Sequence, residues 1–181
     1  MIRWSVAMFF ATILISGTIS FVSDEIMENS AVFVAFLILL VIITIGVVFD
    51  TIGVAVTSAD EKPFHSMAAR KVPGAAEAIQ LLRNAERVSS ICNDVIGDIC
   101  GVVSGSASAT IAVQILRKAD FSWPDAIPLL MSALAAGLTV GGKAIGKALA
   151  IHSGTGIVAG VGRIIYTFNH IPDLFKRKNN S

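Results

Sequence analysis

The sequence predicts an all-α integral membrane protein with four transmembrane helices, an amphipathic cytoplasmic connector and an amphipathic C-terminal helix. Of the 181 residues, 54% are hydrophobic and only 15% are charged. The mean hydropathy of +0.75 lies above the range of soluble globular domains. A helix needs about 20 apolar residues to cross a bilayer. Four stretches reach that length, and they comprise residues 4–22, 31–57, 91–116 and 127–151.

The first stretch follows Arg3 and shares some features with a signal peptide. Its apolar run is long, and no clear small-residue cleavage motif precedes Ser23, so we expect a permanent helix. An acidic outer turn over residues 24–28 should follow it. Residues 1–30 are therefore expected to form an additional N-terminal transmembrane helix and its outer loop.

Basic residues predict the orientation of the spans. They gather in the connector over residues 58–90, at Arg3 and in the tail at residues 176–178. Lysine and arginine collect in cytoplasmic loops, so both termini should be cytoplasmic. The expected outer turn over residues 117–125 begins with a basic pair, which is the one exception to this bias. We expect the protein in the inner (plasma) membrane of a bacterium.

Two segments outside the spans have the pattern of amphipathic helices. In the connector, apolar residues recur every three or four positions over residues 75–88, which is typical of a helix lying along the inner leaflet. The second segment lies within residues 153–181, after the last span. It either lies at the interface or extends the fourth span, because four closely spaced glycines weaken an independent helix. These are Gly154, Gly156, Gly160 and Gly162.

Charged side chains inside the spans are the strongest functional signal. A charge in hydrocarbon costs roughly 2.5–3.5 kcal/mol on insertion scales, so such residues usually face a bundle interior or a polar cavity. Three separate spans carry them, at a similar depth near the cytoplasmic side. Asn93 lies beside them, and the charged residues are Asp50, Asp94, Asp98, Lys143 and Lys147.

Residues four apart on a helix point the same way, so the two lysines should share a face, as should Asp94 and Asp98. Two carboxylates facing two ammonium groups would offset each other's desolvation, and Asp50 would leave a surplus of one negative charge. Such a cluster can bind a cation, carry a proton or lock three helices together. Side chains near the end of a span can also reach the headgroups, which would leave them without a chemical role.

Small residues repeat along the third and fourth spans. Such faces let helix backbones approach closely, either within the bundle or across a dimer. A backbone-lined ion path is the alternative interpretation. The glycines concerned are Gly97, Gly101, Gly105, Gly142 and Gly146.

Neither catalysis nor nucleic-acid binding is indicated. His65, His152 and His170 lack the spacing of a metal-binding pair, and the sequence contains no nucleophile elbow or phosphate-binding loop. A net charge of +1 with dispersed basic residues argues against a nucleic-acid partner. We therefore expect a protein that is not an enzyme, has no assigned cofactor and has the lipid bilayer as its main partner.

Four local motifs follow one another in a recognisable order. Residues 49–55 read Phe-Asp-Thr-Ile-Gly-Val-Ala, and residues 74–87 form an Ala-rich basic segment that ends in Asn-Ala-Glu-Arg. Cys-Asn-Asp opens the third span at residues 92–94, and residues 142–150 read Gly-Lys-Ala-Ile-Gly-Lys-Ala-Leu-Ala. In this order the motifs resemble the transmembrane domain of the CNNM/CorC (CorB) family of magnesium and cobalt transporters. The resemblance implies that residues 31–152 form a family-like transmembrane domain that works as a dimer.

The chain departs from the family pattern at four positions. Lys143 and Gly146 stand where the family has an acidic residue and a proline, while Asp50 and Gly53 replace a serine and an acidic residue. An ammonium group at Lys143 would repel a divalent cation, and magnesium also demands octahedral oxygen ligands. The candidate ligands are thus Mg²⁺ or, in its place, a monovalent cation or a proton. The family's soluble regulatory domains have no counterpart in these residues, so regulation would need a soluble partner.

Two functions of different classes remain compatible with the sequence. The first is a small ion-transport or ion-binding module, built as a homodimer, with the charged residues of the spans as its polar centre. The second is a non-transporting scaffold or accessory subunit that acts through helix packing and its amphipathic segments. Ion flux would mark the first function, and a co-purifying second protein would mark the other.

Overall fold

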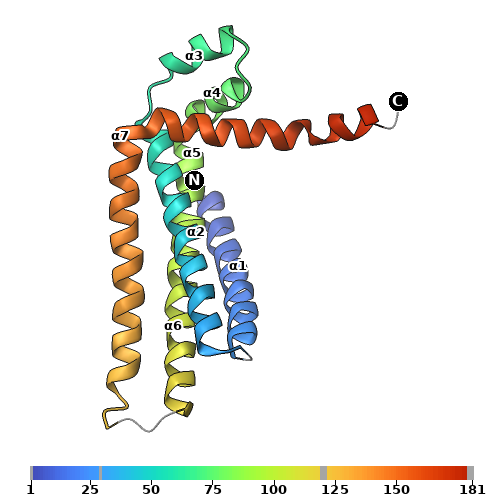
Figure 1. Cartoon of the computed structure of the whole chain (residues 1–181). Coiled ribbons are helices and arrows are strands. Elements are labelled where there is room, and N and C mark those ends of the chain that lie inside the picture. Colours follow the sequence, from blue (N-terminus) through green and yellow to red (C-terminus); the bar gives the residue numbers. More distant parts are fainter. Residues whose placement is uncertain (1, 29, 119–121, 179–181) are drawn as a thin grey trace. The chain divides into compact units, whose positions relative to one another are not determined.

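The computed structural model describes residues 2–28, 30–118 and 122–178, and every regular element within these ranges is a helix (Figure 1). The side chains of Arg3 and of the basic tail, and the middle of the turn expected over residues 117–125, lie outside the described part. Among these residues, four stretches are long and apolar enough to cross a membrane, which confirms an all-helical fold with four candidate membrane spans. They run over Met8–Glu28, Val32–Ser58, Ala85–Lys118 and Ala126–His170.

The chain divides into two compact units. Unit 1 comprises Met1–Asp50 with Cys92–Gly146, and unit 2 comprises Thr51–Ile91 with Lys147–Ser181. The long helices are α1 (Ile2–Glu28), α2 (Val32–Ser58), α6 (Asp98–Lys118) and α7 (Ala126–Lys178). The shorter elements are α3 (Lys62–Ala69), α4 (Ala75–Arg83), α5 (Ala85–Ser90) and the π-helical segment η1 (Ile91–Gly97).

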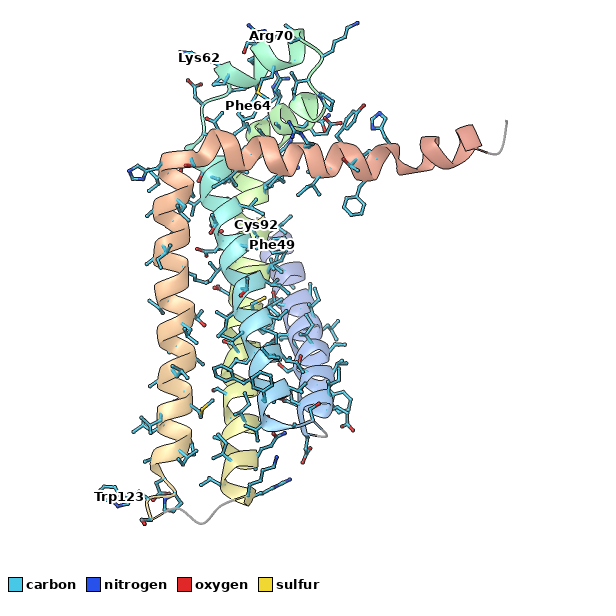
Figure 2. The ribbon with its side chains drawn as sticks, viewed as in Figure 1. Phe49, Lys62, Phe64, Arg70, Cys92 and Trp123 are labelled. Carbon is cyan, nitrogen blue, oxygen red and sulfur yellow. The ribbon has the colours of Figure 1, made fainter. Side chains whose placement is uncertain are left out.

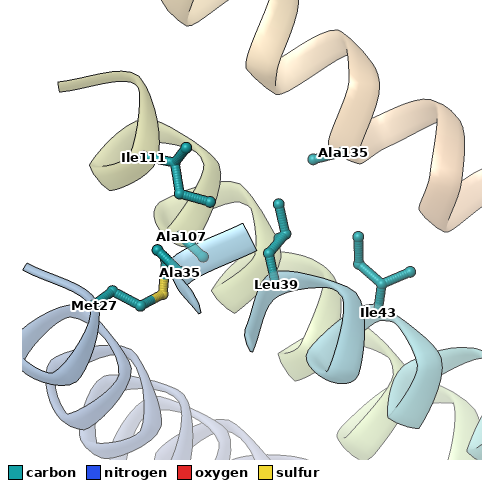
Figure 3. Packing of buried hydrophobic residues seen from close by; sticks show 7 residues of the cluster. All are labelled: Met27, Ala35, Leu39, Ile43, Ala107, Ile111 and Ala135. Atoms are coloured by element: carbon teal, nitrogen blue, oxygen red, sulfur yellow. The ribbon is translucent and has the colours of Figure 1, made fainter. Parts of the chain in front are cut away.

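Unit 1 is a bundle whose core combines alanines with larger apolar side chains. Lipid tails are as apolar as leucine, so packing and polar contacts decide which side chains face inward. Alanines from α2, α6 and α7 leave room for the larger side chains between them. Figure 3 shows this cluster, which comprises Met27, Ala35, Leu39, Ile43, Ala107, Ile111 and Ala135.

The acidic stretch over residues 24–28 is part of α1, so the prediction of an outer turn there was wrong. The helix continues because α6 supplies partners for its carboxylate. Asp24 accepts hydrogen bonds from Ser106 Oγ at 2.8 Å and from Thr110 Oγ1 at 3.1 Å. The two hydroxyl groups lie four residues apart and therefore share one face of α6.

The same face of α6 also holds the end of α1. Gln114 donates a hydrogen bond from Nε2 to the backbone carbonyl of Met27, one of the carbonyls that the end of a helix leaves without an intrahelical donor. Beyond it, Arg117 Nη1 lies 3.4 Å from Glu28 Oε1. These contacts and those of Asp24 form a polar seam between α1 and α6.

Unit 2 contains two short helices, α4 and α5, where the sequence predicted a single helix over residues 75–88. Asn84 interrupts that helix, because its backbone leaves the helical region and its side-chain amide donates to the Gln80 carbonyl at 2.8 Å. Such local side-chain bonds compete with helix propagation.

Phe64 is fully buried and lies between α3 and α4 (Figure 2). The core of unit 2 comprises Ala55, Val56, Phe64, Ala78, Ala150 and Val158.

Helix α7 changes direction within unit 2. Ser153 has a φ of −125° and a ψ of 22°, outside the helical region, and the ribbon turns sharply there (Figure 1). Beyond the turn, α7 meets the connector at Gly74, which has a φ of 86°. A Cβ atom at Gly74 would lie 2.5 Å from the backbone nitrogen of Arg163. Glycine is therefore required here both by its backbone angle and by the close approach of α7.

We expect the polar seam to contribute measurably to stability. The double variant Ser106→Ala/Thr110→Val should lower the free energy of unfolding by about 1–2 kcal/mol, since hydrogen bonds between membrane helices are worth roughly 0.6 kcal/mol each and up to 1.7. Thr18→Val is the control, because Thr18 Oγ1 donates to the Leu14 carbonyl of its own helix. Unfolding titrations in mixed detergent would measure both, and equal losses in the two variants would contradict the assignment.

The contact at Gly74 predicts opposite effects for two glycine substitutions. Gly74→Ala should destabilise unit 2 by about 2 kcal/mol, through the left-handed backbone angle and the overlap with α7. Gly156→Ala should be neutral or stabilise by up to about 1 kcal/mol, because a Cβ atom there meets nothing within 4 Å. Limited proteolysis of the connector and thermal unfolding would report both. Equal behaviour of the two variants would exclude this packing.

Candidate functional site

Three charged side chains from three helices meet in unit 1. Lys143 Nζ of α7 lies 3.4 Å from Asp50 Oδ1 of α2 and 3.8 Å from Asp98 Oδ1 of α6. The side chain of Asp50 is 6% exposed, that of Lys143 is 21% exposed and that of Asp98 is 71% exposed. The amine therefore stands between a buried carboxylate and an exposed one. We call these three residues the charged centre.

A glycine leaves the space in which the amine reaches the buried carboxylate. A Cβ atom at Gly97 would lie 3.4 Å from Lys143 Nζ and 3.6 Å from Asp50 Oδ1. It would also lie 3.3 Å from the carbonyl oxygen of Cys92. The side chain of any larger residue at this position would press against the Lys143–Asp50 ion pair and against the backbone of η1.

Two further glycines let the three helices approach closely enough for their charged side chains to meet. A Cβ atom at Gly46 of α2 would lie 2.8 Å from Cys100 Cβ of α6. One at Gly142 of α7 would lie 2.8 Å from Val47 Cγ2 of α2. Gly46 lies about one turn before Asp50, where the sequence already indicated open space around the carboxylate at a helix contact. Small residues at such contacts let membrane helices approach closely.

The other predicted packing glycines differ in their surroundings. Gly146 is buried. At Gly101 and Gly105, a Cβ atom would meet nothing within 4 Å in a single copy of the chain. The repeat of glycines along the third span therefore combines one position at the charged centre with two positions that have open space beside them.

The segment that precedes Asp98 is π-helical. Segment η1 holds Asn93, which is half-buried, and Asp94, which is exposed. Helices of this type are rare and frequently occur at functional sites. No residue pattern in the sequence indicated it, because the wider turn depends on backbone hydrogen bonding and not on a characteristic side chain. It is the clearest feature of the site that sequence reasoning missed.

The structure divides the predicted polar residues between the two units. Asp50, Asn93, Asp94, Asp98 and Lys143 belong to unit 1, whereas Lys147 is exposed and belongs to unit 2. Within unit 1, the Lys143 ammonium group lies within ion-pair distance of the Asp50 and Asp98 carboxylates.

The donor set fits magnesium poorly. An ammonium group already lies within 4 Å of both carboxylates and would repel a divalent cation. Magnesium further needs near-octahedral oxygen ligands and keeps several of its waters. Among the residues that the structure describes, no group of three or more His, Cys, Asp or Glu side chains is arranged to hold a metal ion.

The ion pair predicts a rescue experiment. Lys143→Met should lower the free energy of unfolding by about 3 kcal/mol, because it removes the cation facing a buried carboxylate. Asp50→Asn in the same chain should restore most of that loss, since an amide needs no counter-ion. Unfolding titrations of the two single variants and the double variant would measure the coupling. Additive losses would show that the two side chains act independently.

The space beside Gly97 predicts a second difference. Gly97→Ala should weaken the Lys143–Asp50 pair and destabilise the protein by about 1–3 kcal/mol, as overpacking does elsewhere. Gly101→Ala, one turn further along in α6 and with open space around it, should be neutral or gain up to about 1 kcal/mol from helix propensity. Thermal unfolding in detergent would compare them. A loss of equal size in Gly101→Ala would place the constraint elsewhere.

No family model matches the chain, no curated protein matches its sequence, and no solved structure matches its fold.

Proposed function

We propose that this protein binds a proton or a monovalent cation at its charged centre and moves it across part of the membrane. The observation that carries this proposal is the place of Lys143, whose amine lies 3.4 Å from buried Asp50 and 3.8 Å from exposed Asp98. The exposure of the three side chains falls from Asp98 through Lys143 to Asp50, as in a charge path that leads from the surface to the interior. Charged residues inside spans mark ion and proton pathways in membrane proteins.

The chemistry follows from the low dielectric around the buried carboxylate. There, the attraction between Asp50 and the ammonium group is strong, and separating the two groups costs free energy because it leaves a buried charge without a counter-ion. A proton that reaches Asp98 from the exposed side can pass to Asp50 only if Lys143 exchanges a proton or swings aside. An incoming monovalent cation would likewise have to displace the amine. Lys143 thus acts as a tethered cation that controls access to Asp50.

A homodimer belongs to this proposal, and the exposure of Asp98 supports it. The carboxylate is 71% exposed in a single copy although its helix belongs to a candidate span. Such a group in hydrocarbon is costly, so a polar cavity or a second copy should face it. A distant relationship to the CNNM/CorC transmembrane domain also belongs to the proposal, and it is carried by the four motifs of residues 49–150.

The orientation is proposed from charge. The connector bears exposed Lys62, Arg70 and Lys71, and basic segments favour the cytoplasmic side. Both termini would then be cytoplasmic, and the connector helices and the last part of α7 would lie near the inner leaflet. Asp98, close to the connector in the sequence, would be reached from the cytoplasm.

Flux measurements in proteoliposomes test the proposal. Wild-type protein should carry H⁺, Na⁺ or K⁺ down an imposed gradient. Asp50→Asn or Lys143→Met should reduce the flux at least about a hundredfold, the lower end of the effect of a positioned proton-transfer group. The matched control is Glu28→Gln/Arg117→Gln, which removes an exposed ion pair of the same 3.4 Å length. This control should retain the wild-type flux.

The result has a clear negative form. Proteoliposomes without flux for any of these ions, or equal flux in wild type and Asp50→Asn, would exclude transport through the charged centre. Mg²⁺ should be carried more slowly than the monovalent ions, because the amine repels it. A flux of Mg²⁺ that exceeds the others would overturn the cation assignment alone.

A scaffold is the second candidate, and the pairing of Lys143 with two carboxylates favours it. Lys143 already lies within ion-pair distance of two carboxylates from two other helices, as a purely structural lock would require. Under this function, Asp50→Asn/Lys143→Met should keep its assembly state and should still co-purify with a second membrane or soluble protein. A homodimer that carries ions without any other protein would contradict it.

A further inference from the structure

Unit 1 contains an apolar cavity that the charged centre does not use. Its volume is about 260 Å³, and it lies among α1, α2, η1 and α6. Its walls are aliphatic apart from one thiol, and they include Ile15 and Ile19 of α1, Ile45 of α2, Val95 of η1 and Cys100 of α6.

The cavity lies in the part of the bundle that should face hydrocarbon. Its residues fall in the middle of three candidate spans, Met8–Glu28, Val32–Ser58 and Ala85–Lys118. It opens to the surface of the bundle, because Ile15, Ile19 and Ile45 are 44%, 41% and 43% exposed. The medium at this opening would be lipid tails.

The lining of this cavity favours neither bound water nor an empty space. A bound water needs two to four polar partners, and the walls provide only aliphatic groups and a weakly polar thiol. A cavity of about 150 Å³ already accommodates benzene, so this larger one can hold a longer hydrocarbon segment. Empty space would leave the lining atoms without contacts on one side, and a flexible chain from the surrounding bilayer can restore them.

We propose that the cavity binds one acyl chain of a membrane phospholipid. The chain would enter between α1 and α2 and lie against Val95 and Cys100, on the wall formed by η1 and the start of α6. The occupant is a lipid and not a water-soluble ligand, because the opening meets hydrocarbon and the walls offer nothing to fix a polar group. This inference requires only that the spans lie in a bilayer and is independent of ion movement.

A single substitution on α1 tests the proposal without disturbing the core. Ile19→Phe should fill part of the cavity, since Ile19 is partly exposed and its larger replacement has room to enter. Ile13→Phe is the matched control, because Ile13 is on the same helix, is 52% exposed and does not line the cavity. Native mass spectrometry in mild detergent should find a retained phospholipid on wild type and Ile13→Phe, and its loss from Ile19→Phe.

The native thiol gives a second readout. In a Cys92→Ala background, a lipophilic maleimide should label Cys100 more slowly after phospholipid is added back to delipidated protein. A phospholipid with a photoreactive group in the middle of its acyl chain should cross-link to residues 95–103. In the Ile19→Phe variant, addition of lipid should no longer slow the labelling of Cys100.

Three outcomes would overturn the proposal. The first is equal retention of lipid by wild type and Ile19→Phe, and the second is labelling of Cys100 that lipid does not slow. The third is cross-linking spread evenly over exposed apolar positions such as Leu14 and Phe21, which would indicate surface lipid alone. A change of oligomeric state in Ile19→Phe, without loss of lipid, would instead assign the cavity to contact between copies.

Discussion

The pairing of Lys143 with buried Asp50 is the interaction on which unit 1 depends most. A carboxylate in an apolar bundle needs a nearby cation, and the amine that supplies it comes from a helix far along the chain. The pair therefore fixes the distance between α2 and α7. Glycine at position 142 lets the two backbones approach, and Gly97 leaves room for the amine itself. The glycines, the close helix contacts that they allow and the ion pair therefore depend on one another.

Polar contacts also explain how the rest of the bundle selects one arrangement. Apolar surfaces alone give little specificity between helices in lipid, because the tails are as apolar as the side chains. The seam from Asp24 to Arg117 joins α1 to α6 through hydroxyl, amide and guanidinium groups in succession along one face. Each contact fixes the rotation of one helix against the other, so the seam sets their register. The small residues of the core then allow the close approach that these bonds require.

Properties that depend on local sequence were predictable, and those that depend on distant partners were not. Length and hydropathy located the four candidate spans. Charge within the spans singled out five residues, and three of them, Asp50, Asp98 and Lys143, lie within ion-pair distance in the structure. Asp24 was assigned to a turn because its hydroxyl partners lie 82 and 86 residues further along the chain, where no periodic pattern indicates them. The interruption at Asn84 had a readable cause, since asparagine bonds to nearby backbone. The π-helical segment had none, because the wider turn leaves no compositional mark.

The polar seam also affects how α1 moves. Its hydrogen bonds and ion pair hold the part of α1 from Asp24 to Glu28, whereas the part that includes Ile15 and Ile19 packs through aliphatic groups beside the cavity. Aliphatic contacts in lipid are readily exchanged for contacts with tails, so they restrain a helix less than bonded polar groups do. The fluctuations of α1 should then be smallest at the seam and increase with distance from it. The opening of the cavity would widen and narrow with these fluctuations.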